Sequence, residues 1–109
     1  MDILVIGGGG REHSLCWAIS KSPRCNKLYC TPGNAGISDI AECVNIPDNN
    51  ISDIVTFAKI NNIDLVVIGP EGPLVLGLVD ALEAENIKTF GPSANAAQLE
   101  GSKAFMKQL

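Results

Sequence analysis

An unbroken run of four apolar residues, Leu65 to Ile68, is the feature that most narrows the folds open to this chain. A strand with one face in water alternates apolar and polar residues, whereas a strand of a parallel sheet is covered on both faces and does not. Similar short runs rich in β-branched residues recur along the chain. We expect five strands, at Asp2–Ile6, Lys27–Cys30, Glu42–Ile46, Asp64–Ile68 and Lys88–Phe90.

Segments with helical periodicity separate these strands. Apolar residues spaced i, i+3, i+4 and i+7 predict one helix from Ile51, capped by Asn50, and another that enters through Pro73. A shorter stripe follows the first glycine run, and Ser93 can cap a further turn. Alternating strands and helices form right-handed βαβ units. The predicted fold of residues 1–109 is therefore one α/β domain, an open, doubly wound, Rossmann-like, mostly parallel sheet with helices on both faces.

Composition and charge exclude several classes of protein. With 46% apolar and 18% charged residues, the chain is globular, and its net charge of −4 argues against duplex nucleic-acid binding. No apolar segment approaches the roughly 20 residues that a membrane span requires. Asp2 stands where a secretory signal would carry a basic residue. We therefore expect a cytoplasmic protein with neither a nucleic-acid nor a membrane partner.

The four cysteines, Cys16, Cys25, Cys30 and Cys43, are not arranged as metal ligands. They form no C-x-x-C pair, so a zinc site is not expected. Cys16 falls in a predicted helix and Cys30 in a predicted strand. Free thiols that pack as small apolar residues are favoured over a disulfide framework.

Three loops rich in glycine and proline follow the first, second and fourth predicted strands. They span residues 7–13, 31–36 and 69–74. The carboxyl ends of parallel strands lie at one edge of a sheet, and ligands of such sheets bind beyond that edge. The three loops together therefore predict a binding site there.

The first loop has the composition of a phosphate-binding turn. Gly9 and Gly10 would let the backbone approach a ligand, the following helix would offer free N–H groups, and Arg11 could add a charged contact. The alternative is a tight turn without a ligand. A dinucleotide site is disfavoured, because Glu12 stands at the third glycine position and Thr31 begins the segment where a ribose-binding acid is expected.

Polar residues in and beside these loops are further candidates. Glu12 and His13 could bind a sugar hydroxyl or an amine, although a histidine here could equally cap or pack. Glu71, held next to Pro70, could likewise bind an amine or ribose, or be a solvated turn acid. Asn34 could bind ligand or only supply turn geometry.

The motifs together resemble those of glycinamide ribonucleotide synthetases. That family has G-[NS]-G-G-R-E-H, P-G-N-A-G, G-P-E-A-P-L-V and F-G-P followed by A-Q-L-E-G-S-K. Their counterparts here occur in the same order, at residues 7–13, 32–36, 69–75, 90–92 and 97–103. Two positions depart from the pattern: Gly8 replaces Asn or Ser, and Gly72 replaces Ala.

The resemblance implies the amino-terminal, pre-ATP-grasp domain of an ATP-grasp ligase. In this family ATP phosphorylates the carboxylate of glycine, and the amine of phosphoribosylamine attacks the acyl phosphate. The products are glycinamide ribonucleotide, ADP and phosphate, with magnesium or manganese on the nucleotide. The ATP-grasp domains would follow Leu109. Residues 1–109 alone are then expected to hold no cofactor, metal ligand or catalytic residue.

The resemblance also assigns residues to ligands. Lys103 would approach the phosphates of ATP from the junction with the next domain. The ribose-phosphate substrate would be contacted by Gly9, Gly10, Arg11, Glu12, His13, Gly33, Asn34, Pro70 and Glu71.

Two other functions compete with this one. The chain could be a stand-alone nucleotide-binding module, which tight NAD binding would support. It could also be a scaffold whose loops only connect the layers. In that case replacing Arg11 or Glu71 would leave the kinetics of the full-length protein unchanged.

Overall fold

Five short strands form one parallel sheet in the order β3-β2-β1-β4-β5. The computed structural model describes residues 1–69 and 73–90. The strands are β1 (Asp2–Gly7), β2 (Lys27–Pro32), β3 (Glu42–Cys43), β4 (Leu65–Ile68) and β5 (Lys88–Phe90). The helices are α1 (Gly10–Ser20), the 3-10 turn η1 (Ile37–Asp39), α2 (Ile51–Ile60) and α3 (Pro73–Ala84). Every strand pair is parallel, which confirms the predicted fold class.

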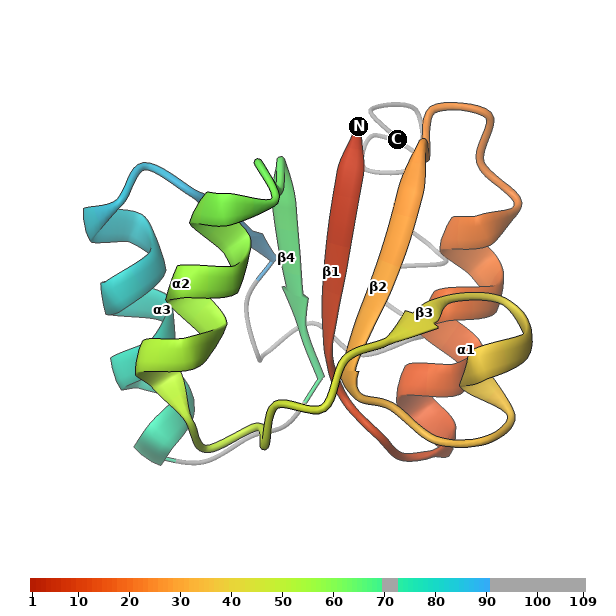
Figure 1. The fold of residues 1–109 in the computed structure, drawn as a ribbon, viewed down its shortest axis with the longest axis horizontal. Coiled ribbons are helices and arrows are strands. Elements are labelled where there is room, and N and C mark those ends of the chain that lie inside the picture. The colour runs from red at the N-terminus through yellow and green to blue at the C-terminus, as the bar shows by residue number, and fades with distance from the viewer. Residues whose placement is uncertain (70–72, 91–109) are drawn as a thin grey trace.

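Helices cover both faces of the sheet, with α1 and η1 on one face and α2 and α3 on the other (Figure 1). The central strand β1 serves both layers, because successive side chains of a strand point to opposite faces. Ile3 and Val5 pack in the core beneath α1. Leu4 and Ile6 pack in the core beneath α2 and α3. All four side chains are at most 1% exposed.

Strand β4 is buried on both faces, as its unbroken apolar sequence predicts. Leu65 and Val67 join the α1 core, and Val66 and Ile68 join the opposite core. No residue of this strand is more than 8% exposed. Burying each such side chain contributes roughly 1.5–3 kcal/mol, so the four together anchor the sheet beside β1.

Four of the strand boundaries differ from the predicted ones. The fourth strand begins at Leu65 and not at Asp64, and the other differences lie at the carboxyl ends. The first two strands extend by one and two residues, because Gly7 pairs with Pro32 in register. The third strand is shorter than the predicted Glu42–Ile46. Its ladder ends because Ile46 N donates to Val44 O at 2.9 Å and to the hydroxyl of Thr31 at 3.2 Å.

Helix α2 begins at the predicted cap. The Asn50 side chain accepts a hydrogen bond from Asp53 N at 3.2 Å, and its amide group also donates to the Asp53 carboxylate at 2.9 Å. Ile54 and Ala58 are buried against the sheet. The α3 helix likewise starts at Pro73, as predicted. The turn expected after Ser93 lies outside the described residues.

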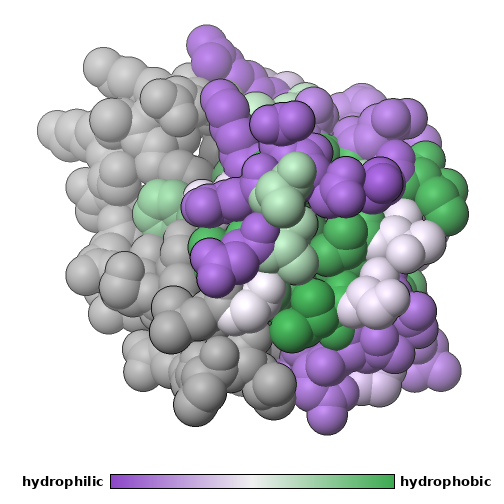
Figure 2. Space-filling view, turned by 90° about the vertical axis from the view of Figure 1, so that its left-hand side faces the viewer, coloured by the Kyte–Doolittle hydropathy of each residue, from purple (hydrophilic) through white to green (hydrophobic). Residues whose placement is uncertain are grey.

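The side of the molecule that carries α2 and α3 is largely hydrophilic around an apolar patch (Figure 2). Beneath this surface, the partly buried Ile51, Val55 and Val79 pack against the core of that layer. The longest helix that the structure describes has 12 residues. In residues 1–69 and 73–90, no helix combines the length and apolarity needed to cross a membrane.

The cap of α2 gives a direct test of the fold. Replacing Asn50 by Ala removes the acceptor for Asp53 N, so we expect the free energy of unfolding to fall by about 1 kcal/mol in urea titrations. Asn49→Ala, at the exposed preceding position, is the matched control and should change it little. Equal effects of the two substitutions would contradict the capping role.

Candidate functional site

The carboxyl ends of β1, β2 and β4 meet at one edge of the sheet, as the sequence predicts. They lie together at the lower edge of the molecule in Figure 1. Gly33 N donates to Gly7 O at 3.1 Å, and Gly69 N donates to Ile6 O at 3.1 Å. The strand order turns back at β1, since the chain adds β2 and β3 on one side and β4 and β5 on the other. Such a switch point is where open α/β sheets bind ligands.

The first loop opens directly into α1. Gly7 has φ +130°, a conformation that favours glycine, and Gly9 is the extended residue before the helix. The first helical bond runs from His13 N to Gly9 O at 3.0 Å. The N–H groups of the three preceding residues therefore have no acceptor within the helix. They form a positively polarised helix end of the kind that binds anions.

Arg11 and Glu12 lie in this first helical turn, as predicted. The Arg11 side chain is 42% exposed, and its Nε lies 3.8 Å from Glu12 Oε2. Glu12 is only 8% exposed. Its Oε1 accepts a hydrogen bond from Gly9 N at 3.1 Å. Arg11 can therefore reach a ligand in solvent, while Glu12 turns inward to the loop.

The second loop is tied to the first through Asn34. Its Nδ2 donates to Gly8 O at 2.8 Å, and its Oδ1 accepts from Ile37 N at 2.9 Å. Gly33 has φ +71°, and a side chain there would collide with Cys43. Asn34 therefore supplies turn geometry and also fixes the position of the phosphate-type loop.

Gly8, a departure from the family pattern, lies where the two loops come closest. A methyl group at this position would lie 2.8 Å from Gly33 O. Because that neighbour is backbone, it could not swing away as a side chain could. In this chain Gly8 permits a tighter approach of the loops than Asn or Ser would.

His13 is exposed and lies against the second loop. A methyl group at Gly36 would come within 2.9 Å of its Cε1 and 3.2 Å of its Nδ1. The missing side chain of Gly36 therefore makes room for the imidazole. This places His13 at the seam between the first and second loops, where a ligand bridging them could reach it.

Two features of the site disfavour a dinucleotide, as expected. Glu12 stands at the third glycine position of the dinucleotide fingerprint. Its side chain fills the space in which that glycine would let the helix pack closely against the sheet. Thr31, near the end of β2, is fully buried, and its hydroxyl donates to Val44 O at 2.9 Å. It is therefore not placed to bind a ribose in the way that the usual acid does.

The cysteines are free thiols in the structure, as predicted. Cys16 and Cys30 are buried in the α1 core. The hydrogen bond to Cys30, together with burial, raises the pKa of the Cys16 thiol, so it stays protonated and packs as a neutral group. Among residues 1–69 and 73–90, no group of three or more histidine, cysteine or acidic residues is arranged to hold a metal ion.

Three predicted site residues, Pro70, Glu71 and Lys103, lie outside the described residues. Gly9, Gly10, Arg11, Glu12, His13, Gly33 and Asn34 are all described, and the structure gathers them at one edge. Sequence reasoning missed the part played by Gly69, which lies beside the Glu12 carboxylate. The available signal was a glycine directly after a buried strand, at the same level as Gly7 on the neighbouring strand.

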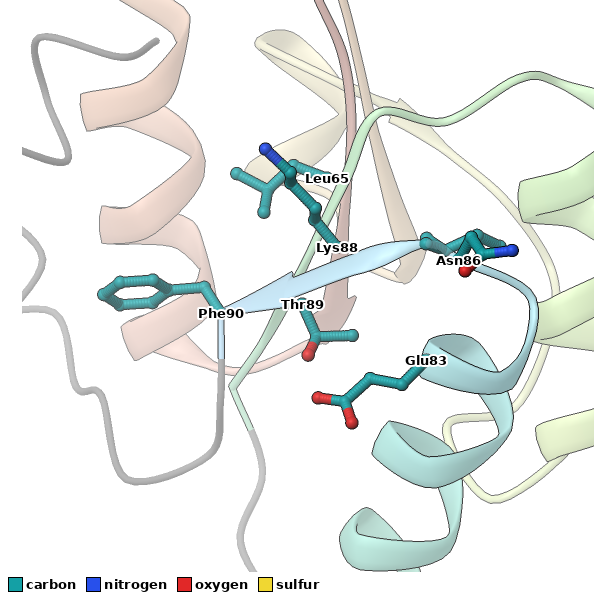
Figure 3. Close-up of a pocket in the computed structure, with 7 residues that line it drawn as sticks. Leu65, Glu83, Asn86, Lys88, Thr89 and Phe90 are labelled. Atoms are coloured by element: carbon teal, nitrogen blue, oxygen red, sulfur yellow. The ribbon is translucent and has the colours of Figure 1, made fainter.

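A hollow of about 480 Å³ lies elsewhere, beside β5 (Figure 3). In that view Glu83 and Thr89 lie on one side of β5, and Leu65 and Lys88 on the other. The remaining residues that line the hollow are Asn86, Ile87 and Phe90. Leu65 and Lys88 begin their strands, so the hollow reaches the edge opposite the glycine loops. Parallel sheets bind their ligands at the carboxyl ends of their strands, so the loops and not this hollow are the candidate site.

Fold and site together define a Rossmann-like α/β domain with a candidate anion site at its switch point. A family model described as "Phosphoribosylglycinamide synthetase, N domain" matches residues 1–100. The chain belongs to this family, and the resemblance drawn from its motifs is thereby confirmed.

Named relatives agree with the family. The chain is 57% identical over 109 residues to a phosphoribosylamine–glycine ligase of Rhizobium meliloti and 53% identical to that of Caldanaerobacter subterraneus subsp. tengcongensis. Each alignment covers 100% of this chain and 26% of the relative. The ligase of Pasteurella multocida is 50% identical, over 98% of this chain and 25% of the relative. The chain thus spans about a quarter of the length of these curated relatives.

The Asn34 tie between the loops can be tested by stability. Asn34→Ala removes two hydrogen bonds, each worth roughly 0.5–1.5 kcal/mol net, so the free energy of unfolding should fall by about 1–2 kcal/mol. Ser38→Ala is the control, because it removes one exposed bond, to Ala35 O. If Asn34→Ala proved as mild as Ser38→Ala in urea titrations, the tie would contribute nothing measurable.

Proposed function

We propose that this chain is the substrate-binding amino-terminal domain of a phosphoribosylamine–glycine ligase of de novo purine biosynthesis. The parent enzyme would use ATP to phosphorylate glycine and let the amine of phosphoribosylamine attack the acyl phosphate. It would release glycinamide ribonucleotide, ADP and phosphate in the cytoplasm. The observation that carries the proposal is the meeting of two family motifs at the start of α1, where Asn34 donates to Gly8 O at 2.8 Å.

Within this proposal the sugar phosphate lies on the first turn of α1. The free N–H groups after Gly9 would receive the phosphate oxygens, because backbone dipoles can hold an anion even though the whole chain carries net charge −4. Arg11 would add a charge-assisted hydrogen bond. His13 and Asn34, at the seam of the loops, would face the ribose. Glu71 is proposed for the same substrate.

ATP and its magnesium or manganese ion belong to the proposal for the parent enzyme. The part of the chain that the structure describes offers no cluster of metal-ligating side chains, so no step is assigned to a metal here. Lys103 is proposed to approach the ATP phosphates. The metal ligands and most contacts to the transferring phosphoryl group would come from the ATP-grasp domains of the same protein.

Arg11 is the side chain whose loss best tests the phosphate site. In the full-length ligase, Arg11→Ala should lower kcat/KM for phosphoribosylamine roughly 10- to 100-fold, since a hydrogen bond to a charged group is worth about 1.5–3 kcal/mol. The loss should appear mainly as a raised KM for phosphoribosylamine, with the KM for glycine nearly unchanged. Steady-state kinetics with each substrate varied in turn would measure this.

Arg24→Ala supplies the matched control. Arg24 is also exposed, and it lies in the connection between α1 and β2, at the amino edge of the sheet. Removing it changes net charge equally without touching the loops. Equal losses of kcat/KM in the two variants would show that the effect of Arg11→Ala comes from the change in net charge alone. That result would overturn the assignment of Arg11 to the phosphate site.

Residues 1–109 by themselves should show no ligase turnover. Positioning and electrostatic stabilisation of the transferring phosphoryl group supply most of the catalysis in such reactions, and the proposal assigns them to the ATP-grasp domains. Purified chain with ATP, glycine and phosphoribosylamine should therefore form ADP at the background rate in a coupled assay. ADP formation above background would place catalytic groups in this domain.

A further inference from the structure

A buried acid next to an anion site calls for a physical reason. Glu12 is 8% exposed and stands in the first turn of α1, where its negative charge would oppose a bound phosphate. Burying a carboxylate is unfavourable unless hydrogen bonds or charges compensate. The compensation here is a hydrogen bond from Gly9 N at 3.1 Å, the nearby Arg11 at 3.8 Å and the positive end of the helix.

Two glycines form a socket for this carboxylate: Gly7, the last residue of β1, and Gly69, which directly follows β4. A methyl group at Gly69 would lie 2.8 Å from Glu12 Cγ and Cδ and 3.0 Å from its Oε2. A side chain at Gly7 would occupy the same space as the carboxylate itself. Both glycines are buried. The end of β1 and the end of β4 are therefore shaped around Glu12.

The bond to Gly9 N decides which backbone groups remain for a ligand. Glu12 is the third residue of α1, and its carboxylate reaches back to the N–H of the residue before the helix, as in one half of a capping box. This bond removes the Gly9 N–H from the set of free donors and fixes the loop in front of the helix. Within residues 1–69 and 73–90, the N–H groups of Gly10, Arg11 and Glu12 itself have no hydrogen-bond acceptor.

We propose that Glu12 is a positioning residue, which holds the Gly8–Gly10 turn in its anion-binding shape from the Gly7–Gly69 socket and does not itself contact the substrate. This inference rests on the proposed function for the identity of the anion, a ribose phosphate. It changes the role of Glu12 from the ligand contact that the family motif implies to a support of the loop. The carbonyl oxygen of a glutamine could serve equally well, since the role requires an acceptor and not a charge.

Glu12→Gln and Glu12→Ala in the full-length ligase separate the two roles. If Glu12 positions the loop, the Gln variant should keep kcat/KM for phosphoribosylamine within about threefold of wild type, and the Ala variant should lose about tenfold or more through a raised KM. If the Gln variant falls as far as the Ala variant, the charge acts directly on the substrate amine. That result would overturn the proposal, as would an Ala variant with unchanged kinetics.

A substitution in the socket tests the proposal by a second route, which does not require the Glu12→Ala variant to fold. Gly69→Ala should displace the carboxylate and raise KM in the same way, whereas Gly77→Ala, at an exposed position in α3, should leave the kinetics unchanged. Adding Glu12→Ala to Gly69→Ala should cost little more than either change alone, since both disrupt one contact. If the kinetic losses of the two substitutions were fully additive, Gly69 and Glu12 would act independently, and the proposed socket would be overturned.

A spectroscopic readout keeps this test separate from the proposed function. In full-length protein labelled with ¹⁵N-glycine, the Gly9 amide should be protected from hydrogen exchange in wild type and Glu12→Gln and lose protection in Glu12→Ala and Gly69→Ala. Unchanged protection in all four would overturn the positioning role. Calorimetry with glycinamide ribonucleotide tests the proposed function: if wild type does not bind it while the Gly9 pattern holds, the substrate assignment fails and the role of Glu12 stands.

Discussion

The parallel pairing of β1 with both β2 and β4 is the constraint on which the rest of the structure depends. It brings three strand ends to one edge, where Gly33 N and Gly69 N donate to backbone carbonyls of Gly7 and Ile6. Loops that are far apart in the sequence thereby become neighbours at the amino end of α1. Without this pairing the glycine motifs would be separate turns, and no shared site would exist.

The glycines of this edge serve chiefly to make room for other groups. Gly7 and Gly69 leave space for the Glu12 carboxylate, Gly8 lets the backbone of the second loop approach, and Gly36 leaves space for the His13 imidazole. Among the described glycines of this edge, conformational freedom itself is required where φ is positive, at Gly7 and Gly33. These contacts define the shape of the turn before α1, and anion binding by backbone N–H groups depends on such a turn.

The sequence predicts the fold well because its local signals agree with one another. The unbroken apolar run Leu65–Ile68 predicts a strand that the structure confirms. Asn50 and Pro73 predict where two helices begin, and both helix starts are confirmed. The end of β3 could not be predicted, because it depends on a long-range bond from Ile46 N to Thr31. The inward turn of Glu12 could not be predicted for the same reason, since its socket is formed by two residues 62 positions apart in the sequence, Gly7 at the end of β1 and Gly69 directly after β4.

In the proposed function, the phosphate of a ribose-phosphate substrate is held by backbone N–H groups at the start of α1. A crystal structure of the full-length ligase with glycinamide ribonucleotide measures this most directly. We predict phosphate oxygens within hydrogen-bond distance of the N–H groups of Gly10 and Arg11, with the ribose toward His13 and Asn34. A nucleotide bound in the hollow beside β5, with the first turn of α1 free of phosphate, would contradict the account.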